Sequence, residues 1–99
     1  MLVKVHRNRE GKVVVAICDK ELIGKRLEDG KVQLDLSSDF YKGEERLVSE
    51  IADLMRNANI INLVGEKSIR LALREELISK ENVKYVCGIP HAQVILLQE

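Results

Sequence analysis

The stretch from residue 60 to residue 87 constrains the fold more than any other part of the sequence. It begins with the apolar run IINLV at 60–64, breaks at Gly65, continues as an amphipathic segment at 66–77 and ends in VKYVC at 83–87. Apolar residues recur at helical spacing in the middle segment, whereas the flanking runs have the length of strands. A strand, a helix and a strand of these lengths predict a right-handed crossover, so we expect the two strands to run parallel.

The N-terminal part of the chain predicts an antiparallel hairpin. LVKVHR at residues 2–7 alternates between apolar and polar side chains, NREG follows as a turn, and KVVVAIC at residues 12–18 is a second strand. From Val13 onwards the second strand is apolar on both faces, which is typical of a strand that is covered on both sides. We therefore expect this strand near the centre of the sheet.

A second hairpin is predicted around the Asp-Gly dipeptide at residues 29–30. Such a dipeptide favours a two-residue turn between strands. In that register Glu28 pairs with Lys31, and Leu27 pairs with Val32. The turn would then place an opposite-charge pair beside an apolar pair.

A first helix is predicted at about residues 44–58, where apolar side chains recur at helical spacing and Arg56 lies in the last turn. The complete pattern predicts the α+β class. We expect a single domain over residues 1–99, because this length suits one core. Its sheet is mixed, with N-terminal antiparallel hairpins and a C-terminal βαβ unit, and its two main helices lie at about 44–58 and 66–77.

The charge balance narrows the functions that are open to the chain. Basic and acidic side chains each number 16, so the net charge is zero and a generally cationic nucleic-acid binder is not indicated. Aromatic residues make up only 3%, which argues against a base-stacking platform for single strands. Residues 1–31 carry eight basic and five acidic side chains, so this part can form a modest basic surface, although we favour ordinary solvated strand faces as the explanation.

The cysteines and the charged residues predict the setting of the protein. Cys18 and Cys87 are far apart, the start of the chain is too charged for a signal peptide, and no apolar run is long enough to span a membrane. We therefore expect a cytoplasmic protein with reduced thiols. Charged residues make up 32%, which is typical of a thermophile. The two histidines and two cysteines lack paired spacing, so we expect neither a metal site nor a cofactor.

The first candidate site is the segment NLVGEKS at residues 62–68, in which a predicted strand passes through a glycine into a helix. Free backbone amides at such a helix start can receive an anion, for example a phosphate of RNA. The plainer interpretation, which we favour, is a helix start with a solvated face. The candidate residues are Asn62, Gly65, Glu66, Lys67, Ser68 and Arg70.

The second candidate site is Cys18 with Asp19, at the end of the apolar strand. A thiol acts as a nucleophile only when a nearby base or a lowered pKa activates it. His91 can supply that base if the fold brings it close. The alternative is a buried cysteine with a structural role.

The third candidate site is the segment GIPHAQV at residues 88–94, which we expect to be a loop between the last two strands, VKYVC and VILLQ. Pro90 fixes the backbone there, while His91 and Gln93 supply a titratable ring and an amide. A rigid loop of this kind can present a histidine for acid–base chemistry or for hydrogen bonding. The alternative is a turn histidine that only caps backbone groups.

Several segments together resemble a known family. They are LVKVHR, VAICDKELIGK, FYKGE, ANIINLVGEKSIRLAL and NVKYVCGIPHAQVILL. In this order they are similar to the small archaeal proteins grouped as domain of unknown function 424, over almost the whole chain. The resemblance implies an archaeal, cytoplasmic protein of one domain with an association with RNA or translation. It implies no catalytic residue.

These observations lead to three hypotheses about function. The first is a non-catalytic binding module for RNA, or for the ribosome and translation factors. The second is a small enzyme in which Cys18, Asp19 and His91, with Ser68, line one cleft. The third is an interaction subunit that pairs an exposed apolar strand or helix face with another protein or a second copy. The sequence does not give the oligomeric state.

Overall fold

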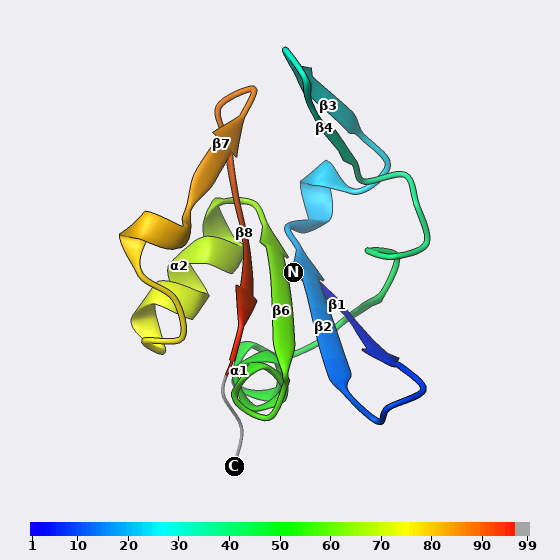
Figure 1. The fold of residues 1–99 in the computed structure, drawn as a ribbon, viewed down its shortest axis with the longest axis vertical. Helices are drawn as coiled ribbons and strands as arrows, with labels where there is room; N and C mark the ends of the chain where they lie inside the picture. Colours follow the sequence, from blue (N-terminus) through cyan, green and yellow to red (C-terminus); the bar gives the residue numbers. More distant parts are fainter. Residues whose placement is uncertain (97–99) are drawn as a thin grey trace.

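The computed structural model describes residues 1–96, which form a six-stranded mixed sheet, a separate hairpin and two α-helices (Figure 1). The sheet strands, in spatial order, are β5 (Glu44–Glu45), β1 (Leu2–Arg7), β2 (Val13–Cys18), β6 (Ile60–Val64), β8 (Ile89–Ile95) and β7 (Lys84–Val86). The other elements are the hairpin β3 (Arg26–Asp29) and β4 (Val32–Asp35), the helices α1 (Val48–Arg56) and α2 (Glu66–Arg74), and the short 3-10 turns η1 (Lys20–Leu22) and η2 (Lys80–Asn82). The predicted α+β class is confirmed.

The centre of the sheet combines parallel and antiparallel pairs. β2 pairs with β6 in parallel, from Val14 opposite Ile60 to Cys18 opposite Val64. Both β6 and β7 pair with β8 in antiparallel fashion, so β6 and β7 run in the same direction, as predicted for the strands around α2. The crossover nevertheless skips one position, because β8 lies between them.

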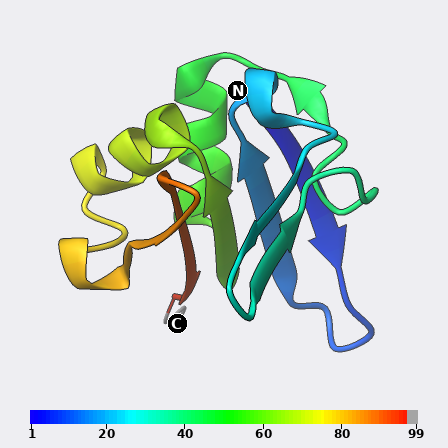
Figure 2. The same cartoon turned by 90° about the horizontal axis from the view of Figure 1, so that it is seen from above.

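The sheet is covered differently on its two faces (Figure 2). α1 and α2 cover one face over the larger core, in which Ile17, Ile61 and Leu63 of the sheet are fully buried. The other face carries a smaller core, where Cys18 packs with Leu36 from the chain after the β3–β4 hairpin. This second core covers only part of its face.

Both helices are shorter than predicted. Residues 44–45 form β5 beside Leu2 and Val3, where Gly43 lies so close to the backbone of β1 that an added Cβ would be 2.0 Å from the Val3 carbonyl oxygen. α1 therefore begins only at Val48. α2 ends at Arg74, and two residues later the backbone is left-handed at Glu76, with a φ of 58°.

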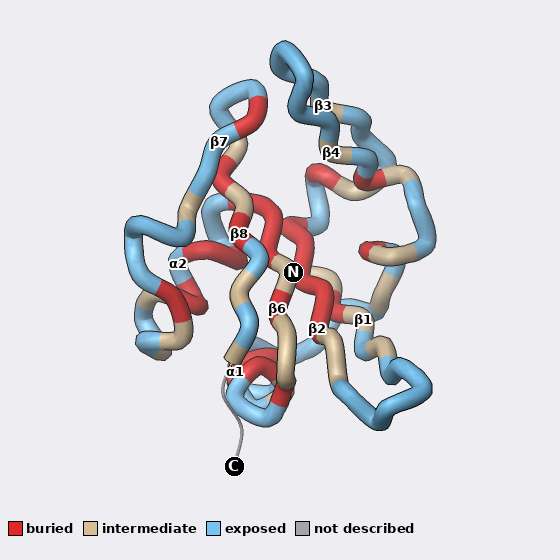
Figure 3. The backbone as a smooth tube through the Cα atoms, in the orientation of Figure 1, coloured by how far each residue is buried: buried red, intermediate tan, exposed pale blue. Residues whose placement is uncertain are grey.

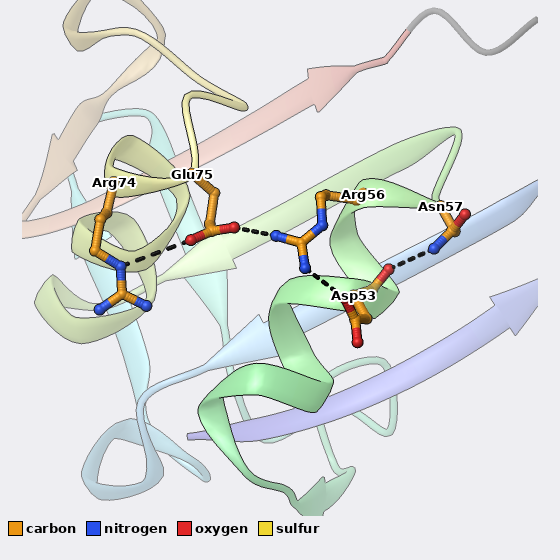
Figure 4. Close-up of polar contacts among 5 residues, drawn as sticks. All are labelled: Asp53, Arg56, Asn57, Arg74 and Glu75. Atoms are coloured by element: carbon orange, nitrogen blue, oxygen red, sulfur yellow. Dashed lines mark hydrogen bonds and ion pairs between the residues drawn. The ribbon is translucent and has the colours of Figure 1, made fainter.

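The ends of the two helices are joined by a polar network centred on Arg56 (Figure 4). Its guanidinium donates to Asp53 within α1 and to Glu75 after α2. Asn57 Nδ2 donates to the Asp53 carbonyl oxygen at 2.8 Å, and Arg74 Nε lies 3.7 Å from Glu75 Oε2. Exposed ion pairs each contribute about 0–1 kcal/mol, so this network orients the helix ends more than it stabilises the fold.

The register predicted for the β3–β4 hairpin is wrong by two residues, because the turn lies one position further along the chain. Leu27 pairs with Leu34 and Asp29 with Val32, so the turn is at residues 30–31. This register places both leucines, half-buried, against the smaller core and leaves Val32 50% exposed. Burial of the leucine pair therefore outweighs the preference of the Asp-Gly dipeptide for the turn centre.

The segment GIPHAQV is also not the loop that was predicted, because most of it belongs to β8. The turn consists of Cys87 and Gly88, whose φ angles of 52° and 76° are both left-handed. Pro90 is tolerated in a strand because it lies one residue beyond the last β6 pair, in which Val64 faces His91. Of the strand predicted at VILLQ, residues 97 and 98 lie outside the described part.

No helix within residues 1–96 is long and apolar enough to cross a membrane.

Candidate functional site

The start of α2 is occupied by a carboxylate of the protein itself. Asp19 follows β2 and is only 2% exposed. Its Oδ1 accepts hydrogen bonds from the Ser68 amide at 2.9 Å and the Ser68 hydroxyl at 2.7 Å, and its Oδ2 accepts from the Lys67 amide at 3.0 Å. The amides of Lys67 and Ser68 are therefore satisfied internally, which fits the plain helix start that we favoured over an anion site.

Gly65 makes this close approach possible. Its φ of 109° is a conformation that side chains rarely adopt, and an added Cβ would lie 2.2 Å from Asp19 Cγ. Its amide donates to the Pro90 carbonyl oxygen at 2.8 Å, while the Asp19 amide donates to the Val64 carbonyl oxygen at 3.0 Å. We call Asp19, Gly65 and Ser68 the α2 junction, and we assign it a structural role because its polar groups pair with one another.

The side chains of Glu66, Lys67 and Arg70 are exposed beside this junction. With Glu21 and Leu22 they line a shallow depression of about 310 Å³. Carboxylates and cations alternate there, so the depression offers no consistent charge to a phosphate.

Cys18 is not arranged as a nucleophile. It is fully buried, and its thiol donates to the Asp19 carbonyl oxygen at 3.3 Å. Burial, followed by the charges of Asp19 and Glu21, raises its pKa to about 12, so little thiolate exists at neutral pH. Val64 of β6 lies directly between Cys18 of β2 and His91 of β8. Cys18 and His91 are therefore two strand spacings apart, which is roughly 9–10 Å. The predicted convergence of Cys18 with His91 is therefore not observed.

His91 instead faces a different space, which we call the polar cleft. It has a volume of about 370 Å³ and lies on the sheet face opposite the helices. The β3–β4 hairpin stands on one side of this space and β7 on the other (Figure 1). The lining residues are Leu34, Tyr41, Asn62, Asn82, Lys84, His91, Ala92 and Gln93.

The register explains why these side chains meet. Asn62 of β6 lies directly opposite Gln93 of β8, and Lys84 of β7 lies directly opposite His91. Because side chains alternate along a strand, Asn62 points away from the helices while its neighbours Ile61 and Leu63 point into the larger core. The cleft therefore has a polar floor on an otherwise apolar sheet.

The polar groups of the cleft are free to bind something else. Within residues 1–96 the side chains of Tyr41, Asn62, His91 and Gln93 form no hydrogen bond. In the same part of the chain no fully buried side-chain nitrogen or oxygen lacks a partner, so these groups are reached by solvent. They form a set of donors and acceptors that water or a ligand must satisfy.

The cleft carries little charge. Burial, and then the charge of Lys84, lowers the pKa of His91, which favours its neutral ring. Burial, and then Cys18, raises the pKa of Tyr41 to about 12, so its hydroxyl keeps its proton. Among the described residues that line the space there is no carboxylate, and Lys84 is the cation. Among the described residues no group of three or more His, Cys, Asp or Glu side chains could hold a metal ion.

The predicted site residues thus divide into two places. Asn62, His91 and Gln93 share the polar cleft, whereas Cys18, Asp19, Gly65 and Ser68 lie at or beside the α2 junction with the Pro90 carbonyl. Tyr41 and Lys84 also line the cleft, but they were not among the site residues predicted from the sequence. Lys84 carries a signal, because it alternates with apolar residues on β7, but Tyr41 lies in an irregular segment and carries none.

Comparisons with known proteins agree with this fold. A family described as protein of unknown function (DUF424) matches residues 6–97. The crystal structure of an uncharacterized conserved protein from Methanopyrus kandleri superimposes with a TM-score of 0.82 at 28% sequence identity, covering 99% of this chain and 93% of that one. No curated protein matches the sequence.

Proposed function

This chain belongs to the DUF424 family of proteins of unknown function, and we propose that it is a non-catalytic binding module that holds RNA in its polar cleft. One observation carries the proposal. Four polar side chains, Tyr41, Asn62, His91 and Gln93, converge on one space without hydrogen-bond partners in the described chain. Groups that are left unpaired at one place are available to a ligand.

The chemistry of the cleft supports an unpaired base as the group that enters it. Amide side chains both donate and accept, so Asn62 and Gln93 match the edge of a base. Sequence-specific RNA recognition targets bases in loops, bulges and ends, whose edges are open to such contacts. Lys84 at the side of the cleft suits one phosphate. A chain of zero net charge binds RNA through such local contacts rather than through a broad cationic surface.

The arrangement also favours binding over catalysis. The hydroxyl of Ser68 and the thiol of Cys18 both donate to Asp19, and both side chains are buried. His91 lines another space and has no nucleophile as a hydrogen-bond partner within residues 1–96. A nucleophile and its base must lie within hydrogen-bond reach of each other.

The proposed setting is the translation apparatus in the cytoplasm, with the ribosome or its factors as partners. Both cysteines are free thiols, which suits a reducing compartment. The RNA-associated role that the resemblance implies is compatible with a cleft of this chemistry.

The test is the affinity for a fluorescent single-stranded RNA of mixed sequence, measured by anisotropy at low salt. We expect Asn62→Ala with Gln93→Ala to weaken binding about 5- to 150-fold, because hydrogen-bonded contacts to one base edge contribute roughly 1–3 kcal/mol. Gln33→Ala is the matched control, because Gln33 is an exposed amide on β4 outside the cleft.

Salt dependence adds a second readout. With Lys84 as the main phosphate contact, the slope of log K against log salt should be shallow, at about −0.7 per contacted phosphate. The proposal is wrong if the wild-type chain binds no RNA at low salt, or if the double variant binds as tightly as Gln33→Ala.

A further inference from the structure

The β3–β4 hairpin forms one wall of the polar cleft, but it is not part of the six-stranded sheet. Its two strands pair with each other as a separate two-stranded sheet. Leu27 and Leu34 are half-buried, and the other residues of both strands are exposed. Figure 3 shows the hairpin as a largely exposed projection beyond the buried centre of the molecule. Few apolar contacts therefore hold it against the rest of the protein.

The base of the hairpin is fixed, whereas its tip is held weakly. At the base, the Gly24 amide donates to the carbonyl oxygen of Leu36 at 2.8 Å, and the Leu36 amide donates to the Lys25 carbonyl oxygen at 2.7 Å. Leu36 itself is fully buried in the smaller core. At the tip, the exposed Cys87 thiol donates to the Glu28 carbonyl oxygen at 3.1 Å. Because a thiol is a weak donor, the tip contact can break while the base stays in place.

The opposite wall of the cleft lacks this freedom. β7 belongs to the six-stranded sheet through its pairing with β8, from Lys84 opposite His91 to Val86 opposite Ile89. The side chain of Val86 is buried, at 1% exposed. Of the two walls, the β3–β4 hairpin is therefore the one that can move.

We propose that the β3–β4 hairpin is a flap that opens to admit the ligand of the polar cleft and then closes over it. Leu34 is the flap residue that lines the cleft, so closure places an aliphatic side chain against the ligand while Asn62 and Gln93 contact it from the floor. Segments with few buried contacts open at a lower free energy than the core, and lids over binding sites are of this kind. The identity of the ligand, but not the motion, rests on the proposed function.

Hydrogen exchange of the backbone amides tests the opening without any ligand. An isolated two-stranded hairpin is at best marginally stable in water, so its ladder breaks when the flap leaves the smaller core. We expect the ladder amides of β3 and β4 to be protected at least about a hundredfold less than those of β2 and β6. Their exchange should depend little on urea, because the opening exposes little surface. Equal protection in the two sheets would overturn the flap.

A disulfide between the tip and the β7–β8 turn tests the same motion by preventing it. Glu28→Cys places a second thiol beside Cys87, since Cys18 is fully buried and does not compete. In the oxidised monomer the hairpin amides should gain at least about tenfold protection, and the reduced form of the same variant is the matched control. Asp29→Cys is the second variant, because the Cys87 amide nitrogen lies 3.5 Å from Asp29 Oδ2. Unchanged protection in the oxidised monomer, or no disulfide in either variant, would overturn the flap.

The association rate of the fluorescent single-stranded RNA then tests what the flap does at the cleft. We expect the oxidised variant to associate at least about tenfold more slowly than its reduced form, because the flap must open first. Leu34→Ala should release the RNA faster, whereas Val32→Ala, which alters an exposed valine of the same strand outside the cleft, should not. Equal association rates of the oxidised and reduced forms would overturn the flap as a gate. Amides that respond to the disulfide in a protein that binds no RNA would leave the flap standing and refute the proposed function.

Discussion

The α2 junction and the polar cleft both gather polar side chains beside β6, yet they differ in how their polar groups are satisfied. At the junction the Asp19 carboxylate accepts three hydrogen bonds from Lys67 and Ser68. In the cleft the Asn62 and Gln93 amides face each other across β6 and β8 without a hydrogen bond in the described chain. The first arrangement holds three segments together, whereas the second leaves binding capacity unused.

This difference shows that the position of a polar residue on a strand says little about its role until its partners are known. The pattern of a glycine before a helix suggests an anion site, but at Gly65 an internal carboxylate has taken that place. Substitutions at the junction should therefore lower stability, and substitutions in the cleft should lower binding.

The largest expected effect is that of Gly65→Ala. The new Cβ would clash with Asp19 and the backbone would be strained at a φ of 109°, so we expect a loss of roughly 3–5 kcal/mol in the free energy of unfolding. Gly11→Ala is the control, because its φ is 80° but nothing lies within 4 Å of an added Cβ. Urea denaturation should show only about 1 kcal/mol for the control. Equal losses in both variants would contradict the tight junction.

Asp19→Ala should cause the next largest loss in the free energy of unfolding. It leaves the buried Ser68 amide and hydroxyl and the Lys67 amide without their acceptor, so we expect a loss of about 2–3 kcal/mol. Asn62→Ala should change the free energy of unfolding by no more than about 0.5 kcal/mol, because no hydrogen bond in the described chain is lost. Thermal and urea unfolding of the two variants give both losses directly. The contrast between the junction and the cleft is contradicted if Asn62→Ala is as destabilising as Asp19→Ala.

Alkaline pH should weaken the fold through Cys18. Its pKa rises from 9.0 to about 12 on folding, so above pH 9 the unfolded chain loses this proton while the folded chain retains it. Because the unfolded state then binds fewer protons, stability falls as the pH rises from 9 towards 12. Urea midpoints across this window should fall less steeply in Cys18→Ala. A parallel fall in both proteins would assign the effect to other groups such as Tyr41.

The smallest effect concerns the electrostatics of the cleft. Lys84 contributes to the lowered pKa of His91 after burial, so Lys84→Gln should move that pKa back towards its ordinary value. An NMR titration of the His91 ring gives the shift, with the His6 ring as the internal reference. An unchanged His91 pKa would show that Lys84 does not act on the ring.

Much of the fold follows from local pattern. The alternation at residues 2–7 and the apolar run after residue 12 identify β1 and β2, and the strand, glycine and helix around Gly65 are placed correctly. β8 is harder, because a proline argues against a strand. Only the pairing shows that Pro90 lies beyond the last β6 partner, where no amide is required.

The candidate site was harder to predict than the fold. Asn62 stands out as the polar residue of an apolar strand, and His91 and Gln93 alternate on β8. Their meeting depends on β6 and β8 being neighbours, which no local pattern states. Tyr41 reaches the cleft from an irregular segment, so only the tertiary fold brings it there.

One measurement tests the central claim most directly: the side-chain amide signals of Asn62 and Gln93 and the backbone amide signals of Lys67 and Ser68, followed by NMR as single-stranded RNA is added. The first pair lines the polar cleft, and the second pair donates to Asp19. We predict that the Asn62 and Gln93 signals shift with saturation while those of Lys67 and Ser68 stay in place. Shifts confined to Lys67 and Ser68, or no shift at all, would contradict the account.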